Sequence, residues 1–350
     1  MTLDEVVALS LLPDLSRIGL TERLRAEDPT LIERARAGAD AARIVRLRAE
    51  TAGIHILGWD DPHFPALLLA TSDAPPALWY RGSTQALQAP TVAIVGSRAA
   101  TSVALETAHR IASDLGARGV TVVSGLARGV DSAAHRGALD TGRTIAVLGS
   151  GVDRIYPAEH VKLAADIARD GLIVSEYPPR TPPLPFQFPM RNRIISGLSR
   201  AVVVIEANEK SGSLITAAFA LEQGRDVMAV PGNVLSGRNR GAHALIRDGA
   251  KIVECADDIV EELGWTGGAG VEVGRGITAT NVPSNAVSAS TSGDPLLKLM
   301  REDETYDLDA LAAASGFTAV RLLPRLLELE LRGLVHRVSG GRFRRQIRTC

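Results

Sequence analysis

The sequence predicts an α/β protein built around a doubly wound parallel sheet, with a small all-α unit before it and a winged-helix unit after it. From residue 91 onward, short runs rich in Val and Ile alternate with amphipathic stretches of ten or more residues. Near-continuous hydrophobic strands separated by helices are typical of a parallel sheet covered on both faces. The expected strands are residues 92–95, 120–123, 144–148, 172–174, 201–205 and 226–230.

Residues 1–52 are predicted to form a small helical domain, because apolar side chains recur there at roughly helical spacing. At Gly53 the pattern changes to short strands and turns, around residues 54–57 and 74–80. We interpret these as a connecting segment at the edge of the sheet. The main domain is therefore predicted to span residues 53–265.

The remainder divides into a linker and a small domain. Residues 266–294 are rich in Gly, Ala, Thr, Ser and Asn, which predicts a flexible linker. Residues 295–350 predict three short helices and a β-hairpin closed by Gly340 and Gly341, the arrangement of a winged helix. The last twenty residues hold six arginines and no Asp or Glu, a patch that could follow a phosphate backbone or a partner's acidic surface.

Composition excludes several classes of protein. The chain has 350 residues, 45% of them hydrophobic, so it is long enough for several domains and is not a disordered chain. The net charge of -1 gives no global nucleic-acid signature, so a basic site must be local. Cys255 and Cys350 lack partners at metal-ligand spacing, which indicates a reducing compartment and no structural zinc. No apolar run approaches the roughly 18 residues that span a bilayer, and we expect a cytoplasmic protein with no membrane partner.

Small residues follow nearly every expected strand. They are Gly96-Ser97, Ser124-Gly125, Gly149-Ser150-Gly151, Ser175 and Pro231-Gly232. The carboxyl ends of parallel strands meet at one edge of a sheet, where such loops let backbone N–H groups approach an anion. Turns between strands and helices favour Gly and Ser anyway, but five such loops in one sheet indicate a shared site.

Cations accompany the small residues in four segments. These are Gly96-Ser97-Arg98, Ser124-Gly125 with Arg128, Gly129 and His135, Arg191-Asn192-Arg193, and Lys210-Ser211-Gly212-Ser213. Guanidinium and ammonium groups beside glycine and serine suit phosphate. We predict that these residues bind a polyanion. Arg98, just before a helix that begins near Thr101, is the first candidate for a phosphate contact, although it could instead bond to a loop carbonyl.

Individual roles in two of these segments stay open. Arg191 and Arg193 are two residues apart near a helix start, so one could face the site while the other pairs internally. Asp131 is expected to cap the helix that carries His135. That histidine could belong to the core, orient the loop or touch a base.

The segment before Arg191 is aromatic and proline-rich. Residues 185–190 are therefore expected not to be helical. Phe186 and Phe188 could provide stacking platforms for bases, or could be buried core residues.

Several enzyme and cofactor signatures are missing. Arg154 stands where the third glycine of a dinucleotide fingerprint belongs, and Glu209 stands where a Walker A loop needs glycine. There is no Gly-x-Ser-x-Gly elbow, no His-Glu-x-x-His and no cysteine beside a usable base. The pattern predicts binding of a polyanion rather than turnover, with no cofactor and no metal.

A set of motifs in fixed order resembles the DNA-processing protein A family, also called Smf. The motifs are Gly96-Ser97-Arg98, residues 124–131 with His135, Tyr156-Pro157, Ser175-Glu176, residues 188–197, residues 211–217, Val230-Pro231-Gly232 and Gly249-Ala250. The resemblance implies a cytoplasmic bacterial protein of natural transformation that binds single-stranded DNA, recruits RecA and helps to displace single-strand-binding protein. It also implies a Rossmann-like core that forms a homodimer, an N-terminal domain of the sterile-alpha-motif type and a DNA pocket on the four cationic segments.

Two departures and two alternatives accompany this resemblance. Val103-Ala104 stands where the family usually has an aromatic residue and glycine, and residues 13–19 lack the Gly-x-Gly of a working helix-hairpin-helix. The Ser-Gly-Ser-x-x-Thr segment with Glu222 also looks like the phosphate loop of lysine-decarboxylase-like nucleotide phosphoribohydrolases. A winged-helix transcription regulator is the other alternative, and it predicts sequence-specific duplex binding.

Overall fold

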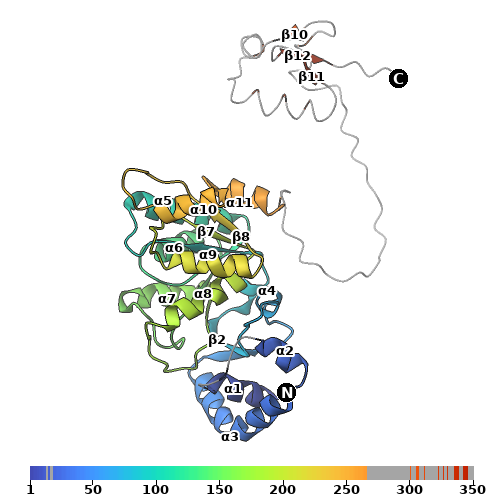
Figure 1. Ribbon diagram of the computed structural model, residues 1–350, viewed down its shortest axis with the longest axis vertical. Coiled ribbons are helices and arrows are strands. Elements are labelled where there is room, and N and C mark those ends of the chain that lie inside the picture. The colour runs from blue at the N-terminus through green and yellow to red at the C-terminus, as the bar shows by residue number, and fades with distance from the viewer. Residues whose placement is uncertain are drawn as a thin grey trace, which may run out of the picture. The chain divides into compact units, whose positions relative to one another are not determined.

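The computed structural model describes residues 1–12, 15, 19–265, 300, 305–306, 311, 322, 326, 329, 335–338 and 342–345. The chain forms two compact units, Met1–Arg275 and Gly276–Cys350 (Figure 1).

A nine-stranded sheet forms the core of the first unit. Its strands are β1 His55–Gly58, β2 Ala77–Gly82, β3 Thr91–Val95, β4 Thr121–Ser124, β5 Thr144–Val147, β6 Leu172–Ser175, β7 Ala201–Val204, β8 Asp226–Ala229 and β9 Lys251–Ile252. Their order is β1-β2-β6-β5-β4-β3-β7-β8-β9. Neighbours from β6 to β9 are parallel, while β1 and β2 add an antiparallel edge. The predicted parallel sheet is confirmed, and the connecting segment supplies its edge.

Helices follow most of these strands. They are α1 Leu3–Leu11, α2 Leu20–Arg25, α3 Pro29–Thr51, α4 Ala66–Leu69, α5 Ser102–Ala117, α6 Val130–Thr141, α7 Val161–Asp170, α8 Gln187–Gly197, α9 Ser213–Glu222, α10 Arg240–Arg247 and α11 Ala256–Glu262, with short 3-10 helices η1 Thr84–Leu87 and η2 Ala158–His160.

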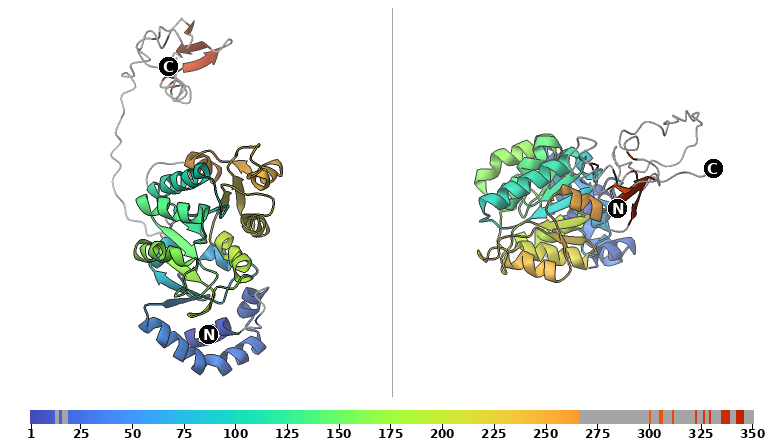
Figure 2. Two further views of the ribbon diagram at one scale, coloured as in Figure 1. Left: turned by 90° about the vertical axis from the view of Figure 1, so that its left-hand side faces the viewer. Right: turned by 90° about the horizontal axis from the view of Figure 1, so that it is seen from above.

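The helices cover both faces of the sheet, as the views in Figure 2 show. Successive strand residues point to opposite faces, so Val92 and Ile94 pack with α5 and α6, whereas Ala93 and Val95 pack on the side of α8 and α9. Helix α11 shares the first face and α10 the second. Both faces of the central strands are therefore buried, which explains their unbroken Val and Ile runs.

The strand order reverses between β3 and β7. From β3 the chain proceeds through β4 and β5 to β6, and then returns to place β7 on the other side of β3. The loop after one of these two adjacent strands runs to one face of the sheet, and the loop after the other runs to the opposite face. A crevice forms between the two loops at the carboxyl end of the sheet. The fold therefore places any ligand site at the ends of β3 and β7.

Three helices precede the sheet, and two of them, α1 and α3, share part of its core. Thr2 and Glu5 form a capping box at the start of α1, and the Asp28 side chain caps α3, with Pro29 at the first helical position. Val7 and Ala42 from these helices belong to one buried cluster with Trp79 of β2. The helical prediction for this segment is confirmed for the residues described.

The second unit contains a three-stranded sheet with the order β10-β12-β11. Its strands are β10 Thr305–Tyr306, β11 Val335–Val338 and β12 Arg342–Arg345, and β11 and β12 form the predicted hairpin. Helical leucines at 311, 322, 326 and 329 are buried with Val335 and Phe343. The linker predicted at residues 266–294 lies outside the described residues. Among the helices that the structure describes, none has the length and apolar character needed to cross a membrane.

Candidate functional site

A crevice of about 450 Å³ opens at the carboxyl ends of β3 and β7. We call it the strand-end crevice. It is lined by Val95, Gly96, Ser97, Arg98, Ala99, Ala127, Asp131, Phe188, Pro189, Arg191, Asn192, Ile195, Asn208, Lys210, Ser211, Gly212, Ser213, Ile215 and Thr216. Nine of the fifteen predicted residues are on this wall, and the six that are not are Ser124, Gly125, Arg128, Gly129, His135 and Arg193.

Two exposed cations lie at the rim of the crevice. Arg98 comes from the loop after β3 and Lys210 from the loop after β7. Among the described residues, neither side chain has an ion-pair or hydrogen-bond partner. The Arg98 guanidinium carbon lies 5.7 Å from the centre of the Phe188 ring, within the range of a cation–π contact. Both charges are therefore available to an anion.

The amino end of helix α9 supplies further donors. The Asn208 side chain accepts a hydrogen bond from the Lys210 N–H at 3.0 Å, which shapes the turn before the helix. The Ser211 and Ser213 hydroxyls lie 2.7 Å apart, and Asn192 Nδ2 donates to the Gly212 carbonyl at 3.2 Å. These contacts place hydroxyl groups at the positive end of a helix dipole, a favourable position for phosphate oxygens.

Arg191 forms part of the floor, and its side chain is buried. Nη1 donates to the Gly125 carbonyl at 2.6 Å and to the Val147 carbonyl. Burial lowers the pKa of this guanidinium to about 10, with the nearby Asp131 carboxylate opposing the shift and Arg98 adding to it. Arg191 therefore stays charged at neutral pH.

The expectation that Asp131 caps helix α6 is wrong. Gly129 is the N-cap, and Asp131 lies in the first turn of the helix. Its carboxylate accepts hydrogen bonds from the Gly125 N–H at 3.0 Å and from the Ala127 N–H at 3.4 Å. Burial raises the pKa of Asp131, and Arg191 together with these two N–H groups opposes the rise. The carboxylate thus holds the loop after β4 in place.

Two glycines allow this loop to approach its neighbours. A Cβ on Gly125 would lie 2.6 Å from Arg191 Cζ, and one on Gly129 would lie 2.9 Å from the Arg98 carbonyl. Gly129 also has φ of 76°, a region that favours glycine. Gly125 and Gly129 are thus explained by packing around the crevice, whereas the predicted Gly96 and Gly212 line its wall.

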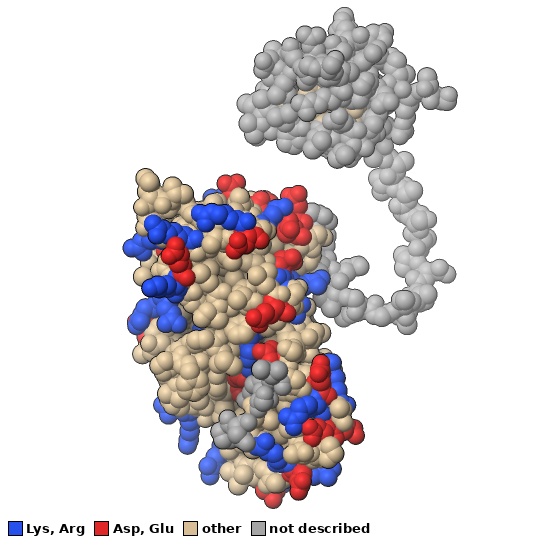
Figure 3. All heavy atoms as spheres, in the orientation of Figure 1, with Lys and Arg blue, Asp and Glu red and all other residues tan. Residues whose placement is uncertain are grey.

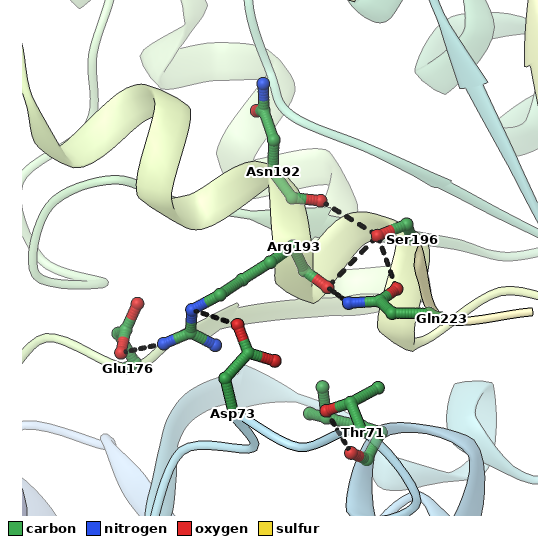
Figure 4. Close-up of polar contacts among 8 residues, drawn as sticks. Thr71, Asp73, Glu176, Asn192, Arg193, Ser196 and Gln223 are labelled. Carbon is green, nitrogen blue, oxygen red and sulfur yellow. Dashed lines mark hydrogen bonds and ion pairs between the residues drawn. The ribbon is translucent and has the colours of Figure 1, made fainter. Parts of the chain in front are cut away.

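Arg193 pairs inside the protein and does not face the crevice (Figure 4). Its Nη2 donates to Glu176 at 2.6 Å, and its Nε lies 3.4 Å from Asp73. Gln223 Nε2 donates to the Arg193 carbonyl at 2.9 Å, which joins α8 to the end of α9. Of the two alternatives left open by the sequence, Arg191 is at the site and Arg193 is the internal partner.

His135 is fully buried and lies beneath the loop rather than on the surface. Its Nε2 accepts from the Leu126 N–H at 3.3 Å, and its Nδ1 lies 2.7 Å from the Thr144 hydroxyl. Burial, reinforced by the charges of His160 and Arg191, lowers the pKa of His135 to about 3, so the ring is neutral. The prediction that His135 touches a ligand is not supported by this position, and the histidine orients the loop instead.

Ser124 and Arg128 also differ from expectation. The Ser124 hydroxyl is buried and donates to the Ile94 carbonyl at 2.6 Å, which ties β4 to β3. Arg128 is exposed, but it forms a two-point ion pair with Glu159 at 2.8 and 2.9 Å. A ligand would therefore compete with Glu159 for this cation.

The segment before Arg191 is helical from Gln187 onward, which corrects the expectation for residues 185–190. Pro189 is the third residue of α8, where the backbone N–H has no partner in any helix, so proline is tolerated. Phe186 is 64% exposed, and Phe188 is partly exposed on the crevice wall. Neither phenylalanine is a buried core residue.

With this geometry established, comparison with known proteins identifies the family. The family described as DNA recombination-mediator protein A matches residues 55–264, which is more than half of the chain. The chain belongs to this family. A second family, the DprA winged helix domain, matches residues 282–341. The mediator family is one of DNA processing in recombination, as the names of its members state.

Named members of the mediator family cover most of the chain. Protein Smf of Escherichia coli is 40% identical over 83% of this chain and 77% of its own length. DNA processing protein DprA of Streptococcus pneumoniae is 46% identical over 58% of this chain and 72% of its own length. These relatives confirm the resemblance seen in the sequence motifs.

Two solved structures of the same family have similar folds. The structure of the Streptococcus pneumoniae protein has a TM-score of 0.66 at 37% identity and covers 75% of this chain and 98% of its own. A structure of DNA processing protein A from Helicobacter pylori, described for its single-stranded DNA binding mode, has a TM-score of 0.56 at 30% identity and covers 61% of this chain and 96% of its own.

Sequence reasoning assigned no site role to Asn208, Thr216 or Tyr156 in this mediator-family chain. Asn208 and Thr216 line the crevice, and Tyr156 lies beside Phe188 with ring centres 5.3 Å apart. Asn208 could have been found as a polar residue just past the end of β7. Tyr156 belongs to the Tyr156-Pro157 motif of the family resemblance, but its proximity to Phe188 depends on the tertiary fold and could not be read from the motif.

The described residues offer little for catalysis or for a metal. Asp131 is the only acidic residue that lines the crevice, and its carboxylate is held by two N–H groups. Glu222, the candidate acid of the phosphoribohydrolase alternative, is the last residue of α9, about 14 Å along the helix from Ser213. Within the described residues, no group of three His, Cys, Asp or Glu could hold a metal ion.

Charge over the visible face is mixed. Figure 3 shows basic and acidic side chains intermingled there, in accord with the net charge of -1. This face therefore carries no broad patch of a single charge in the part of the chain that the structure describes.

Proposed function

We propose that this chain binds single-stranded DNA in the strand-end crevice and, as a non-catalytic recombination mediator, loads RecA onto the bound strand. The observation that carries the proposal is the convergence of Arg98, Arg191 and Lys210 on one crevice whose loops are built of glycine and serine. Cations beside free N–H and hydroxyl donors suit a phosphate backbone. Membership of the mediator family supports the same function.

The polymer is proposed to be single-stranded because the wall of the crevice includes aromatic and aliphatic side chains. Phe188, Ile195 and Ile215 line it together with the cations. Unpaired bases can contact such side chains, whereas the bases of a duplex are stacked on each other. The steps that involve RecA, single-strand-binding protein, a homodimer and a cytoplasmic location rest on the family resemblance.

Binding is tested by anisotropy titration of a labelled oligothymidylate against Arg98→Gln and Lys210→Gln. Both side chains are exposed, so the variants are expected to fold. Each should bind about tenfold more weakly, as expected for the loss of one charge-assisted contact. The slope of log affinity against log salt should fall by about 0.7 for each variant. The matched control is Arg110→Gln, which removes a 78% exposed arginine of α5. Wild-type affinity in both test variants would contradict the proposal.

Loading is tested separately, with RecA ATP hydrolysis on strands that are coated with single-strand-binding protein. The wild-type chain should shorten the lag before hydrolysis, and the two crevice variants should not. Strand binding without any effect on the lag would contradict loading while leaving binding intact. Incubation with nucleoside monophosphates should release no free base, which separates this function from the phosphoribohydrolase alternative.

A further inference from the structure

The Arg98 loop, residues 96–101 between β3 and α5, is attached at two points to a single glutamate. Glu206 lies two residues past the end of β7, and its backbone carbonyl accepts a hydrogen bond from the Ser97 N–H at 2.7 Å. Its side-chain oxygen Oε2 accepts from the Thr101 hydroxyl at 2.7 Å and from the Thr101 N–H at 3.3 Å. Arg98 therefore lies between two attachments to the same residue.

The contact with Thr101 has a defined direction. Thr101 is the N-cap of α5, and its hydroxyl oxygen accepts from the Ala104 N–H at 3.2 Å. Because that oxygen serves the helix, the single hydroxyl proton of Thr101 is donated to Glu206. The same threonine thus caps α5 and joins the beginning of this helix to the segment after β7.

Stability alone does not explain a glutamate at this position. Glu206 is 2% exposed, and among the described residues its second oxygen, Oε1, is buried without a hydrogen-bond partner. A buried polar atom without a partner destabilises the folded state. An apolar side chain would avoid this cost, but it could not accept a hydrogen bond from Thr101. The side chain is therefore explained by the loop that it holds.

The backbone between the two attachments is also fixed. Ser97 Oγ accepts from the Ala99 N–H at 3.2 Å, and Arg238 Nη1 donates to the Ala99 carbonyl at 2.8 Å. The backbone around Arg98 is thus held in the free protein, although the Arg98 side chain is exposed. A loop that is already ordered loses less conformational entropy when it binds a ligand.

We propose that Glu206 is a positioning residue that fixes the Arg98 loop against the segment leading to Lys210. This inference rests on the proposed function, because it needs a strand that contacts Arg98. Glu206 does not line the crevice, so it acts through the loop and not on the ligand. It raises the affinity for the strand by holding the Arg98 backbone in its binding position before the strand arrives.

The test is a double-mutant cycle, read as the affinity for oligothymidylate. Glu206→Ala should weaken binding about tenfold, to the level of Arg98→Gln. In the Arg98→Gln background the same substitution should cause no further loss, because no guanidinium remains to be positioned. Thr101→Ala removes the donor from the other side of the contact and should weaken binding in the same way, which provides a second variant if Glu206→Ala does not fold.

Two further readouts separate positioning from a general loss of structure. Glu206→Gln keeps an oxygen that can accept from Thr101, so it should bind within about twofold of the wild type. The slope of log affinity against log salt should fall by about 0.7 in Glu206→Ala, as expected for the loss of one phosphate contact. Loss of folded protein would instead lower the number of binding sites and leave the slope unchanged.

The matched control is Glu5→Ala. Glu5 also accepts a hydrogen bond from the N–H of an N-cap threonine, Thr2, at 2.7 Å, but it lies in α1 and does not line the crevice. This variant should bind like the wild type.

Several outcomes would overturn the positioning role while strand binding stands. They are wild-type affinity of Glu206→Ala, an equal loss from Glu206→Ala in the Arg98→Gln background, a Glu206→Gln variant as weak as Glu206→Ala, and wild-type affinity of Arg98→Gln alone. Wild-type affinity of both Arg98→Gln and Lys210→Gln would overturn the proposed function and the positioning role together.

Discussion

Arg193 and Glu176 form an ion pair of 2.6 Å in which the two side chains are only 1% and 4% exposed. The pair joins helix α8 to the end of β6, and Asp73 approaches the same guanidinium at 3.4 Å. Because Arg191 is on the same helix, this internal pair helps to position the floor of the crevice.

Removal of the arginine alone should destabilise the fold. Arg193→Met would leave the Glu176 carboxylate buried without its cation, which should lower the free energy of unfolding by about 3–5 kcal/mol. Arg193→Met/Glu176→Gln removes both charges and should recover part of this loss. Urea unfolding of the two variants checks the prediction, and a double variant no more stable than the single one would contradict it.

Stability should depend on pH through His135. The pKa of this buried ring is lowered to about 3, so the folded protein keeps it neutral while the unfolded chain protonates it near pH 6.5. The unfolded state therefore binds more protons as the pH falls below 6.5, and stability is lost in that direction. Between pH 7.5 and pH 5 this histidine should reduce the free energy of unfolding by about 2 kcal/mol. Urea unfolding at both pH values should show a smaller difference for His135→Gln than for the wild type, and an equal difference would contradict the assignment.

Glu159 should weaken DNA binding by holding Arg128. Both side chains are about half exposed, and a surface ion pair of this kind is easily broken. Glu159→Gln should therefore release Arg128 to phosphate and raise the affinity for oligothymidylate roughly two- to tenfold, with a steeper salt dependence. The variant Arg128→Gln/Glu159→Gln is the control. If this control binds as tightly as Glu159→Gln, Arg128 makes no contact with the strand.

Gly125 and Gly212 should respond differently to alanine. A Cβ at Gly125 would lie 2.6 Å from Arg191 Cζ, so Gly125→Ala must displace the guanidinium and should cost about 1–3 kcal/mol. Nothing lies within 4 Å of a Cβ at Gly212, and Gly212→Ala should leave stability nearly unchanged. Thermal unfolding distinguishes them, and equal melting temperatures would show that the Gly125 loop can move aside.

The sheet, and the edge of the sheet that carries the site, could be predicted because the sequence patterns that indicate them are local. The Val and Ile runs fall on β3 to β8, and the small residues after β3 and β7 lie at the crevice. Asn208 lies on the same wall and was missed because a lone asparagine after a strand is also an ordinary turn residue.

The roles of individual side chains could not be predicted, because they depend on residues distant in sequence. Arg191 and Arg193 stand in one Arg-Asn-Arg motif, yet the first contacts carbonyls of Gly125 and Val147 while the second contacts Glu176 and Asp73. His135 likewise acquires its role from Leu126 and Thr144, which surround it only in the fold.

The position of β3 and β7 inside the sheet determines the temperature at which strand binding is lost on heating. Both are interior strands with helices on each face, so the loops that hold Arg98 and Lys210 are attached where amide hydrogens are expected to exchange most slowly. Heating should therefore abolish strand binding at the same temperature at which the whole sheet melts, with no earlier local loosening of the crevice.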